Sequence, residues 1–538
     1  MISDTNIKID RDVCYACGIC VDRCIMDNLR LSVAPCRQAC PINLNCQGYV
    51  RLIAQDRAEE AARELRKYTP FAGILGRICS RPCEGACERN RAIGDGAVNI
   101  RALKRYLDDG YPGITRQMPE IGRSTGLKAA VIGSGPAGLM AAYELRRMGH
   151  GVTVLEGKSQ PGGLMRYGIP RFRLPNSEIE AAIKSLEAIG VEFELGRQVG
   201  RNIEWKELEE NYGAIVVAVG AAGLVPLEVP GNHLEQVISG IDLLARVNNG
   251  HAPDLSAKNV VVIGGGNSAI DTALTCVHCG ASEVRLVCLE GPHEMPVDDS
   301  VLTEAMELGV IIENRWGVDR IYRTLDGRLK LSLKRCLCVF DVEGNFAPQL
   351  DDTPGLHTIE ADMVAVAIGQ TVEPSGLPEG LFDFSTGRFS CDDTTMQSEQ
   401  NPKVFICGDC AQGPSSVVEA FATGKRAGEN AGRYLRGENF WYENDYYLVN
   451  GMVTEYVALP ERAVGGPRQD VLLLPREKRG LDRETELGLS EIAAKREAER
   501  CLSCGRPFES KATCWYCLPC EIECPTRALY VKMPYQVR

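Results

Sequence analysis

Cysteine is the residue type in this chain whose number and spacing could do the most chemistry. The 538 residues include 24 cysteines, of which ten lie in residues 14–87 and six in residues 501–524. Disulfide frameworks belong to small secreted domains, so grouped cysteines in a chain of this length favour metal binding. The six histidines join no Cys/His zinc pattern. The two cysteine-rich zones therefore predict iron–sulfur sites.

Each end of the chain carries one run of four cysteines with the same spacing, and each run resembles half of a bacterial two-cluster ferredoxin. In that pattern the fourth cysteine of one half binds the cluster of the other half. We therefore expect one discontinuous ferredoxin-like domain; the alternative is that each half docks separately against a partner subunit. The two expected 4Fe–4S ligand sets are Cys14, Cys17, Cys20 and Cys524, and Cys514, Cys517, Cys520 and Cys24.

The first of two glycine-rich loops follows the apolar run 129–132. Gly133, Gly135 and Gly138 form G-x-G-x-x-G at the start of an expected helix, and Glu156 ends the next expected strand. The glycines allow a tight turn and let the backbone approach a pyrophosphate at the helix N-terminus, and the acid suits a ribose. The loop predicts a dinucleotide site.

The second loop follows the apolar run 260–263. Gly264, Gly266 and Ala269 take the three small-residue positions, Asn267 opens the helix, and Glu290 ends the next strand. An acid at that strand end accepts the 2′-hydroxyl of NAD and repels the 2′-phosphate of NADP. We therefore predict NAD rather than NADP; the alternative is that Glu290 lies on a solvated loop.

The elements that must position these residues are those of an α/β fold, since apolar strand-like runs alternate with helical stretches in the middle of the chain. Residues 49–67 and 97–108 look helical, and residues 440–490 lack a clear period. The net charge of −12 gives no support to nucleic-acid binding. The N-terminus has no apolar signal core and no run of about 18 apolar residues occurs, so we expect a cytoplasmic protein without membrane segments.

The segment NPKVFICGDCAQGPSSVVEAFATGKRAG at 401–428, together with Gly163 and Leu164, resembles the glutamate synthase small-subunit family of two-dinucleotide flavoproteins. The resemblance covers roughly residues 35–438. It implies an FAD domain into which the NAD(P) domain is inserted, with Gly408 and Asp409 contacting the FAD. The implied boundaries are 1–34 for an N-terminal ferredoxin-like half, 35–122 for a helical iron–sulfur domain, 123–250 and 366–440 for the FAD domain, 251–365 for the NAD(P) domain, 441–490 for a connection, and 491–538 for the C-terminal ferredoxin-like half.

The resemblance also implies two clusters in the helical domain. One would use Cys36 and Cys79 with a CxxC pair that the family has just before Cys36. Here that pair is missing, and we expect the tail to supply it as Cys501 and Cys504. The other cluster would use Cys40, Cys83 and Cys87, and Cys46 is a candidate fourth thiolate because Lys104 occupies the place of an occasional amide ligand. The total is four 4Fe–4S clusters, with three as the alternative.

These parts predict an FAD-dependent NAD(P)H oxidoreductase in which cofactors transfer the hydride and no protein acid or base is needed. We expect an NAD(H)-linked electron-transfer subunit that exchanges electrons with a partner catalytic subunit, such as a 2-oxoacid oxidoreductase. The alternatives are a glutamate synthase small subunit and a stand-alone NADH:ferredoxin reductase. The other eight cysteines, including Cys276 and Cys279, are expected to be structural.

Overall fold

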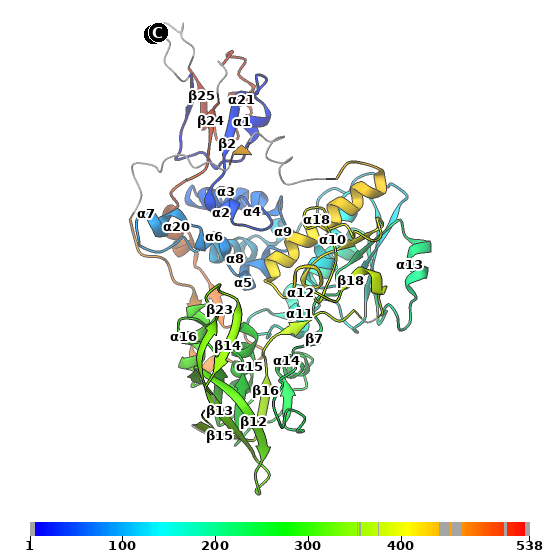
Figure 1. Cartoon of the computed structure of the whole chain (residues 1–538). Coiled ribbons are helices and arrows are strands. Elements are labelled where there is room, and N and C mark those ends of the chain that lie inside the picture. Colours follow the sequence, from blue (N-terminus) through cyan, green and yellow to red (C-terminus); the bar gives the residue numbers. More distant parts are fainter. Residues whose placement is uncertain are drawn as a thin grey trace.

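Two parallel β-sheets of five strands each form the body of the molecule (Figure 1). The computed structural model describes residues 6–351, 353, 357–374, 376–440, 452–453, 465–510 and 514–532. The first sheet has the order β20-β6-β3-β4-β5 and the second the order β11-β10-β9-β16-β8. The central strands of both sheets are buried on two faces, which explains why they are nearly continuous apolar runs. The strands are β3 (Lys128–Ile132), β4 (Gly151–Glu156), β5 (Val191–Leu195), β6 (Ala214–Val217), β20 (Val404–Ile406), and β8 (Val237–Ser239), β9 (Asn259–Ile263), β10 (Glu283–Cys288), β11 (Ile311–Asn314), β16 (Met363–Val366).

The second sheet is inserted into the first along the chain, because β3 to β6 precede it and β20 follows it. Each of the two connections between the sheets contains a short strand, and these strands, β7 (Gly223–Leu224) and β17 (Gln370–Thr371), pair with each other. The predicted α/β class with an inserted nucleotide domain is confirmed. The expected start of that domain at residue 251 comes too late, because β8 pairs in parallel with β16 and is part of its sheet. This three-residue strand is only half-buried, so it has no apolar run to mark it.

Helices cover both sheets, and α18 packs closely along α10. A Cβ on Gly424 of α18 would lie 2.1 Å from the Ala137 carbonyl oxygen of α10, so only glycine allows this approach. The helix begins with a capping box in which Ser416 and Glu419 satisfy each other's backbone N–H groups. The helices are α10 (Pro136–Arg147), α11 (Leu164–Tyr167), α12 (Asn176–Ala188), α13 (Trp205–Asn211), α17 (Asp409–Gln412), α18 (Val417–Arg436) around the first sheet and α14 (Gly240–Asn248), α15 (Asn267–His278), α16 (Asp299–Glu307) around the second.

An antiparallel sheet flanks the second domain, with β13 (Leu329–Phe340) between β12 (Trp316–Arg323) and β15 (His357–Ala361), and β14 (Phe346–Leu350) pairing with the far end of β13. It lies at the lower end of the molecule in Figure 1. Its buried residues share a core with the face of the parallel sheet that they cover, and Val261 and Leu331 belong to that core.

A helical domain lies against the first sheet's helices, above the nucleotide domain in Figure 1. Phe71 stacks on Phe421 of α18 with ring centroids 4.8 Å apart, and the two domains share one continuous apolar core. This core fixes the helical domain on the first sheet and its helices. The helices are α2 (Pro35–Gln38), α3 (Cys46–Ala54), α4 (Ala58–Arg66), α5 (Ala72–Ile78), α6 (Pro82–Gly85), α7 (Glu88–Ala92), α8 (Ile100–Gly110), α9 (Pro112–Thr115) and, from the tail, α20 (Glu491–Glu499).

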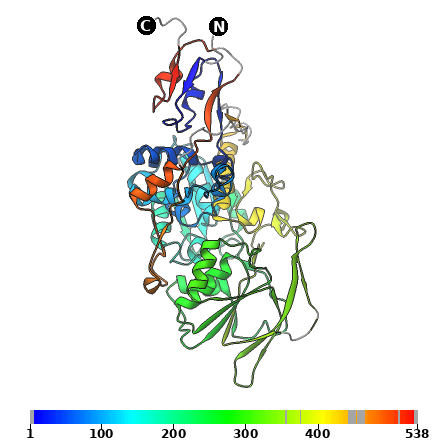
Figure 2. The same cartoon turned by 90° about the vertical axis from the view of Figure 1, so that its left-hand side faces the viewer.

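A small lobe at the outer end of the helical domain is built from both ends of the chain. In Figure 2 its N-terminal blue strands and its C-terminal red strands lie side by side. β1 (Ile7–Ile9) pairs with β25 (Leu529–Val531), and β2 (Leu29–Ser32) pairs with β24 (Arg506–Glu509). The short helices α1 (Ile19–Asp22) and α21 (Pro519–Ile522) contact each other. The predicted ferredoxin-like domain made of two distant halves is therefore present.

The described part of the tail returns over the body before it reaches the lobe. β22 (Leu472–Leu473) and β23 (Glu486–Gly488) form a two-stranded ribbon beside α8. In the expected connection at 441–490, residues 441–451 and 454–464 lie outside the described residues. None of the described helices combines the length and the apolar character that a bilayer span requires.

Candidate functional site

The first glycine loop joins β3 to α10. A Cβ on Gly133 would lie 2.3 Å from the Ala218 carbonyl oxygen, and one on Gly138 would lie 2.0 Å from the Gly133 carbonyl oxygen. At Gly135, by contrast, a Cβ would point into open space. Two glycines thus permit close packing of the turn, and the third leaves room above the helix N-terminus for a pyrophosphate.

The carboxylate of Glu156, at the end of β4, holds this loop in place. Its Oε2 accepts a hydrogen bond from the Ser134 backbone N–H at 3.1 Å and another from the Ser134 hydroxyl, and its Oε1 accepts one from the Lys158 N–H at 2.8 Å. The Ser134 hydroxyl oxygen in turn accepts from the Gly162 N–H at 2.9 Å. The residue between the first two glycines therefore connects the loop to the Gly162–Gly163 turn.

The second loop repeats this geometry between β9 and α15, but one carboxylate oxygen of its acid, Glu290, has no hydrogen-bond partner among the described residues. A Cβ on Gly264 would lie 2.3 Å from the Ala367 carbonyl oxygen, and Gly266 faces open space. A Cβ on Gly265 would lie 2.3 Å from Glu290 Oε2, and this buried oxygen has no hydrogen-bond partner among the described residues. Because an unpaired buried carboxylate oxygen is costly, its position fits a ribose hydroxyl that would donate to it.

A third element completes the first site. Gly408, with φ 76°, precedes α17, and its N–H donates to the Thr423 hydroxyl at 2.9 Å. Asp409 accepts two hydrogen bonds from Ser415, at 3.2 Å from the N–H and 3.1 Å from the hydroxyl. Burial raises the pKa of Asp409, and the bonds from Ser415 oppose that rise. This arrangement holds the start of α18 against the cavity.

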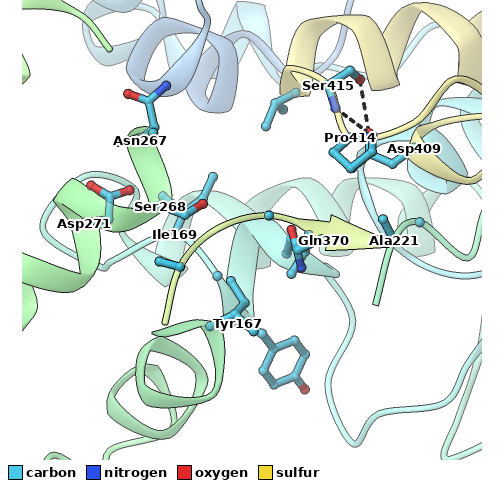
Figure 3. A pocket seen from close by; sticks show the side chains of 18 of the residues that line it. Tyr167, Ile169, Ala221, Asn267, Ser268, Asp271, Gln370, Asp409, Pro414 and Ser415 are labelled. Atoms are coloured by element: carbon cyan, nitrogen blue, oxygen red, sulfur yellow. Dashed lines mark hydrogen bonds between the residues drawn. The ribbon is translucent and has the colours of Figure 1, made fainter. Parts of the chain in front are cut away.

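One cavity of about 1880 Å³ joins all of these loops. Its volume exceeds the roughly 300–1,000 Å³ usual for one small-molecule site, so it has room for two dinucleotides. Figure 3 shows Asn267, Ser268 and Asp271 on one side of it and Asp409, Pro414 and Ser415 on another. The predicted residues on its wall are Gly133, Gly135, Glu156, Gly163, Leu164, Gly264, Gly266, Asn267, Glu290, Gly408 and Asp409, while Gly138 and Ala269 pack beneath it.

Residues of the helical domain also reach this cavity, and Cys79 is one of them. It follows α5 and lies close to Cys40 and Cys83, because these thiols interact electrostatically. Burial raises the pKa of Cys79, and the two thiols add to the rise while Lys104 opposes it. A group bound by Cys79 would therefore lie directly beside the dinucleotide site.

Cys46 joins the same set. Its buried thiol hydrogen-bonds with Cys36, Cys40 and Cys83. The bond from Cys46 is the main cause that lowers the pKa of Cys40 to about 6. The set nearest the cavity thus consists of Cys40, Cys46, Cys79 and Cys83.

A second group of thiols contains Cys87, which was expected in the other set. Cys36 acts electrostatically on both Cys87 and Cys501, and Cys87 acts on Cys501, so these three thiols lie near one another. Burial is the main cause that raises the pKa of Cys501 to about 11. The pairing of Cys79 with Cys36 stays a prediction, and the position of Cys87 favours an exchange of these two thiols. The helix α7, which follows Cys87, is held against the tail, because the buried Arg89 side chain donates to the Arg500 carbonyl oxygen.

The lobe brings together its two expected sets across the chain ends. Cys14, Cys17, Cys20 and Cys524 line one small cavity. Cys514 and Cys520 interact electrostatically with Cys517 and Cys24. Burial is the main cause that raises the pKa values of Cys14 and Cys520 to about 11.

These thiol sets suit multi-iron clusters by the chemistry of their donors. Within the described residues, no three His, Cys, Asp or Glu side chains could hold one metal ion together. A 4Fe–4S cluster has a separate iron for each thiolate, so its ligands need not converge on one point.

Cys276 differs from the cysteines of these sets. It is fully buried in α15, burial raises its pKa, and it is not among the residues that line the cavity.

Two features of the cavity wall were missed by the sequence interpretation. The first is the hydrogen bond between Ser134 and Glu156. Ser134 is the variable residue of G-x-G, so the motif does not predict this bond. The tail residues Leu473, Thr485 and Glu486 also line the cavity, although they lie in a stretch without periodicity. Only the three-dimensional path of the tail places them there.

The comparisons with known proteins agree with this site. Residues 127–424 match the family described as pyridine nucleotide-disulphide oxidoreductase, and residues 20–112 match dihydropyrimidine dehydrogenase domain II with a 4Fe-4S cluster. A solved structure of Mycobacterium tuberculosis FprA in complex with NADPH has the same fold, with a TM-score of 0.50 and 19% identity over 61% of this chain and 90% of that chain.

Three curated relatives are similar over most of the chain. The NADP(+)-dependent formate dehydrogenase subunit beta of Moorella thermoacetica is 33% identical over 88% of this chain and 71% of its own length. The NAD-dependent dihydropyrimidine dehydrogenase subunit PreT of Escherichia coli K12 is 31% identical over 75% and 92%, respectively. The glutamate synthase [NADPH] small chain of Azospirillum brasilense is 31% identical over 75% and 86%. The chain therefore belongs to the FAD- and NAD(P)-dependent iron–sulfur oxidoreductases of the pyridine nucleotide-disulphide oxidoreductase family.

Proposed function

We propose that this protein is the NAD(H)-linked electron-transfer subunit of a multisubunit oxidoreductase, with FAD and four 4Fe–4S clusters between NAD(H) and a partner catalytic subunit. The observation that carries the proposal is Cys79, which belongs to a four-cysteine set and lines the dinucleotide cavity. FAD, when bound, supplies the exchange between a hydride and single electrons. The residues described here bind and align the groups between which electrons pass.

The cysteine sets follow one another from the cavity to the lobe. The set of Cys79 is at the cavity, and Cys46 hydrogen-bonds with Cys36 of the next set. Arg51 on α3 acts electrostatically on both Cys501 of that second set and Cys14 of the lobe, so it lies between them. The exposed Cys517 ends the series at the surface. This order supports a path of four steps with its outlet on the lobe.

The bound nucleotide is proposed to be NAD. Glu290 presents an unpaired oxygen where the ribose would lie. Arg315, whose backbone N–H donates to the Glu290 carbonyl oxygen, has its guanidinium paired with Glu294, with 2.6 Å between Nη2 and Oε1, so this charge is already engaged and does not favour a 2′-phosphate. Relatives named for NAD and for NADP both exist, and the choice rests on these side chains.

The first test interrupts the path outside the cavity. In Cys501→Ser, flavin bleaching by NADH in anaerobic stopped-flow should stay within about twofold, while NADH-dependent ferredoxin reduction falls at least tenfold, because the flavin site remains intact and the second set loses a ligand. The control is Cys279→Ser, because Cys279 lies at the end of α15, remote from the cysteine sets. Undiminished ferredoxin reduction in Cys501→Ser would contradict the proposed path.

The second test identifies the partner by anaerobic purification of the native protein with its bound subunits. A catalytic dehydrogenase subunit is the expected companion. A 2-oxoacid oxidoreductase is our expectation from the ferredoxin-like ends. A glutamate synthase large subunit would support the role of the Azospirillum brasilense relative instead. Recovery alone or with free ferredoxin would favour a stand-alone NADH:ferredoxin reductase.

A further inference from the structure

A cation without a carboxylate partner is buried in the helical domain beside the cavity. Lys104 of α8 is only 2% exposed. Its Nζ donates to the Leu75 carbonyl oxygen at 3.4 Å, and no carboxylate is recorded as its partner within the described ranges. A buried ammonium group is costly unless an anion compensates it.

Four cysteines are the anions that could do so. The Nζ of Lys104 is held on the Leu75 carbonyl oxygen, one helical turn before Cys79 at the end of α5, and its charge acts on Cys79, Cys83, Cys40 and Cys46. These are the four members of the set nearest the cavity. The lysine therefore faces the whole set rather than one thiol.

The position of Lys104 is rigid because α8 is fixed on both sides. Asn99 caps its first turn by accepting from the Ala102 N–H. On the other side, a Cβ on Gly76 of α5 would lie 2.8 Å from the Arg105 Cα, so the two helix backbones touch. Since α5 ends at Cys79, the packing of α5 on α8 sets the position of the lysine relative to that sulfur.

We propose that Lys104 is the counter-cation of the site formed by Cys40, Cys46, Cys79 and Cys83, and that its charge raises the reduction potential of the cluster bound there. The inference rests on the proposed cluster at this site. When such a cluster gains one electron from the reduced flavin, its net charge becomes more negative by one. A fixed cation in a low-dielectric interior stabilises the reduced form more than the oxidised form. The cluster beside the flavin thereby becomes the favoured first acceptor.

The test is an EPR-monitored redox titration of the iron-loaded protein. In Lys104→Met the equilibrium constant for one-electron reduction of one cluster should fall at least tenfold, which is about 59 mV for a one-electron couple. Lys104→Arg keeps the charge and should keep the potential. Arg105→Met is the matched control, because this neighbouring buried cation is already paired with Asp109 and Glu484.

The outcomes separate the inference from the proposed function. If Cys83→Ser leaves the iron content unchanged, there is no cluster at this site and the proposed path fails. If Cys83→Ser loses iron but Lys104→Met leaves every potential unchanged, the inference about Lys104 is wrong.

A variant that cannot hold the cluster is also informative. If Lys104→Met and Lys104→Gln both lose its iron while Lys104→Arg keeps it, the requirement is for the charge and the inference stands. If Lys104→Arg loses the iron as well, the lysine acts through its shape and its bond to Leu75, and the inference is overturned.

Discussion

Two glutamates at equivalent strand ends have different tasks. Both oxygens of Glu156 are occupied by Ser134 and Lys158, so this acid stabilises its own glycine loop. Glu290 has an oxygen with no partner within the described residues, beside Gly265. The carboxylate of Glu156 is therefore hydrogen-bonded within the protein, whereas one oxygen of Glu290 is available to a ligand. The same position in the motif therefore does not imply the same role.

Nucleotide choice should change when the charge of Glu290 is removed. In Glu290→Gln the KM for NADH should rise about tenfold, because hydrogen bonds to charged groups contribute about 1.5–3 kcal/mol. The KM for NADPH should fall, since the repulsion of a 2′-phosphate disappears. Steady-state reduction of an artificial acceptor measures both values.

The control for this variant is Glu283→Gln at the start of β10, the strand that precedes Glu290, because its carboxylate pairs with Arg285 outside the cavity. Its KM values should match those of the wild type. If Glu290→Gln bound NADH as tightly as the wild type, Glu290 would be a loop residue without contact to the ribose.

At the residue scale, the sequence predicted those site residues whose positions are fixed by local structure. Gly133, Gly135 and Gly138 are recognisable because one turn and one helix start fix all three positions. The nearness of Cys87 to Cys36 was not recognisable, because it depends on how distant segments pack. One of these packing contacts joins Arg89, just after Cys87, to the tail some four hundred residues away along the chain.

At the element scale, α20 is the element that holds the tail cysteines. Glu497 of this helix is fully buried. Its two oxygens each accept at 2.7 Å, one from the Asn99 N–H and the other from the Gln469 N–H. It also accepts from Arg500 Nη1 at 2.6 Å. This network joins the last turn before Cys501 to the helical domain.

Removing Glu497 should therefore release the tail. Glu497→Ala removes one of the two carboxylates paired with the buried Arg500, leaving Asp95. It also leaves the backbone N–H groups of Asn99 and Gln469 without their acceptor, which costs about 1–3 kcal/mol for each buried donor. The variant should lose the iron of the second cysteine set and unfold at a lower temperature, as measured by iron analysis and calorimetry. Lys495→Ala on the same helix, which breaks only an exposed pair with Asp56, should cost less than about 1 kcal/mol. Equal iron loss in both variants would contradict this role of Glu497.

The contact between α10 and α18 carries a pH-dependent penalty. Burial, and next the charge of Glu144, raise the pKa of Glu429 from 4.5 to about 7, although Arg147 lies 3.6 Å away. The folded state thus binds more protons than the unfolded state between these values. Its stability falls as the pH rises through that window.

The variant Glu429→Gln removes this penalty. It should unfold at a higher temperature than the wild type at pH 8 and at nearly the same temperature at pH 4.5. The gain should be on the order of 1 kcal/mol, since partial exposure screens part of the shift. Thermal unfolding at the two pH values checks it, and an equal gain at both would show that the carboxylate charge is not the cause.

The elements themselves were predictable to different degrees. Strands such as β3 and β9 are buried apolar runs followed by glycine loops, and both were expected. β8 was not, because three half-buried residues carry no pattern and belong to a sheet only through β16.

At the scale of the whole molecule, we expect each cluster of the lobe to take its cysteine ligands from both ends of the chain. If Cys524 belongs with Cys14, the double variant Cys14→Ser/Cys524→Ser should contain as much iron as Cys14→Ser alone, because both changes affect one cluster. Cys517→Ser/Cys524→Ser should instead lose the iron of two clusters, since changes at independent sites add. Iron analysis of the anaerobically purified proteins gives the answer, and the reverse pattern would mean that each half holds its own cluster.

The pairing of β1 with β25 also has a consequence for biosynthesis. Ile7 leaves the ribosome 524 residues (531 − 7) before its strand partner Val531. At ~5–20 residues per second, the N-terminal half waits tens of seconds for its partner. The flavin and nucleotide domains can fold during this interval, whereas the outermost cysteines can be filled with iron only after most of the chain has been made. Maturation should therefore proceed from the interior outward, with the electron outlet assembled last.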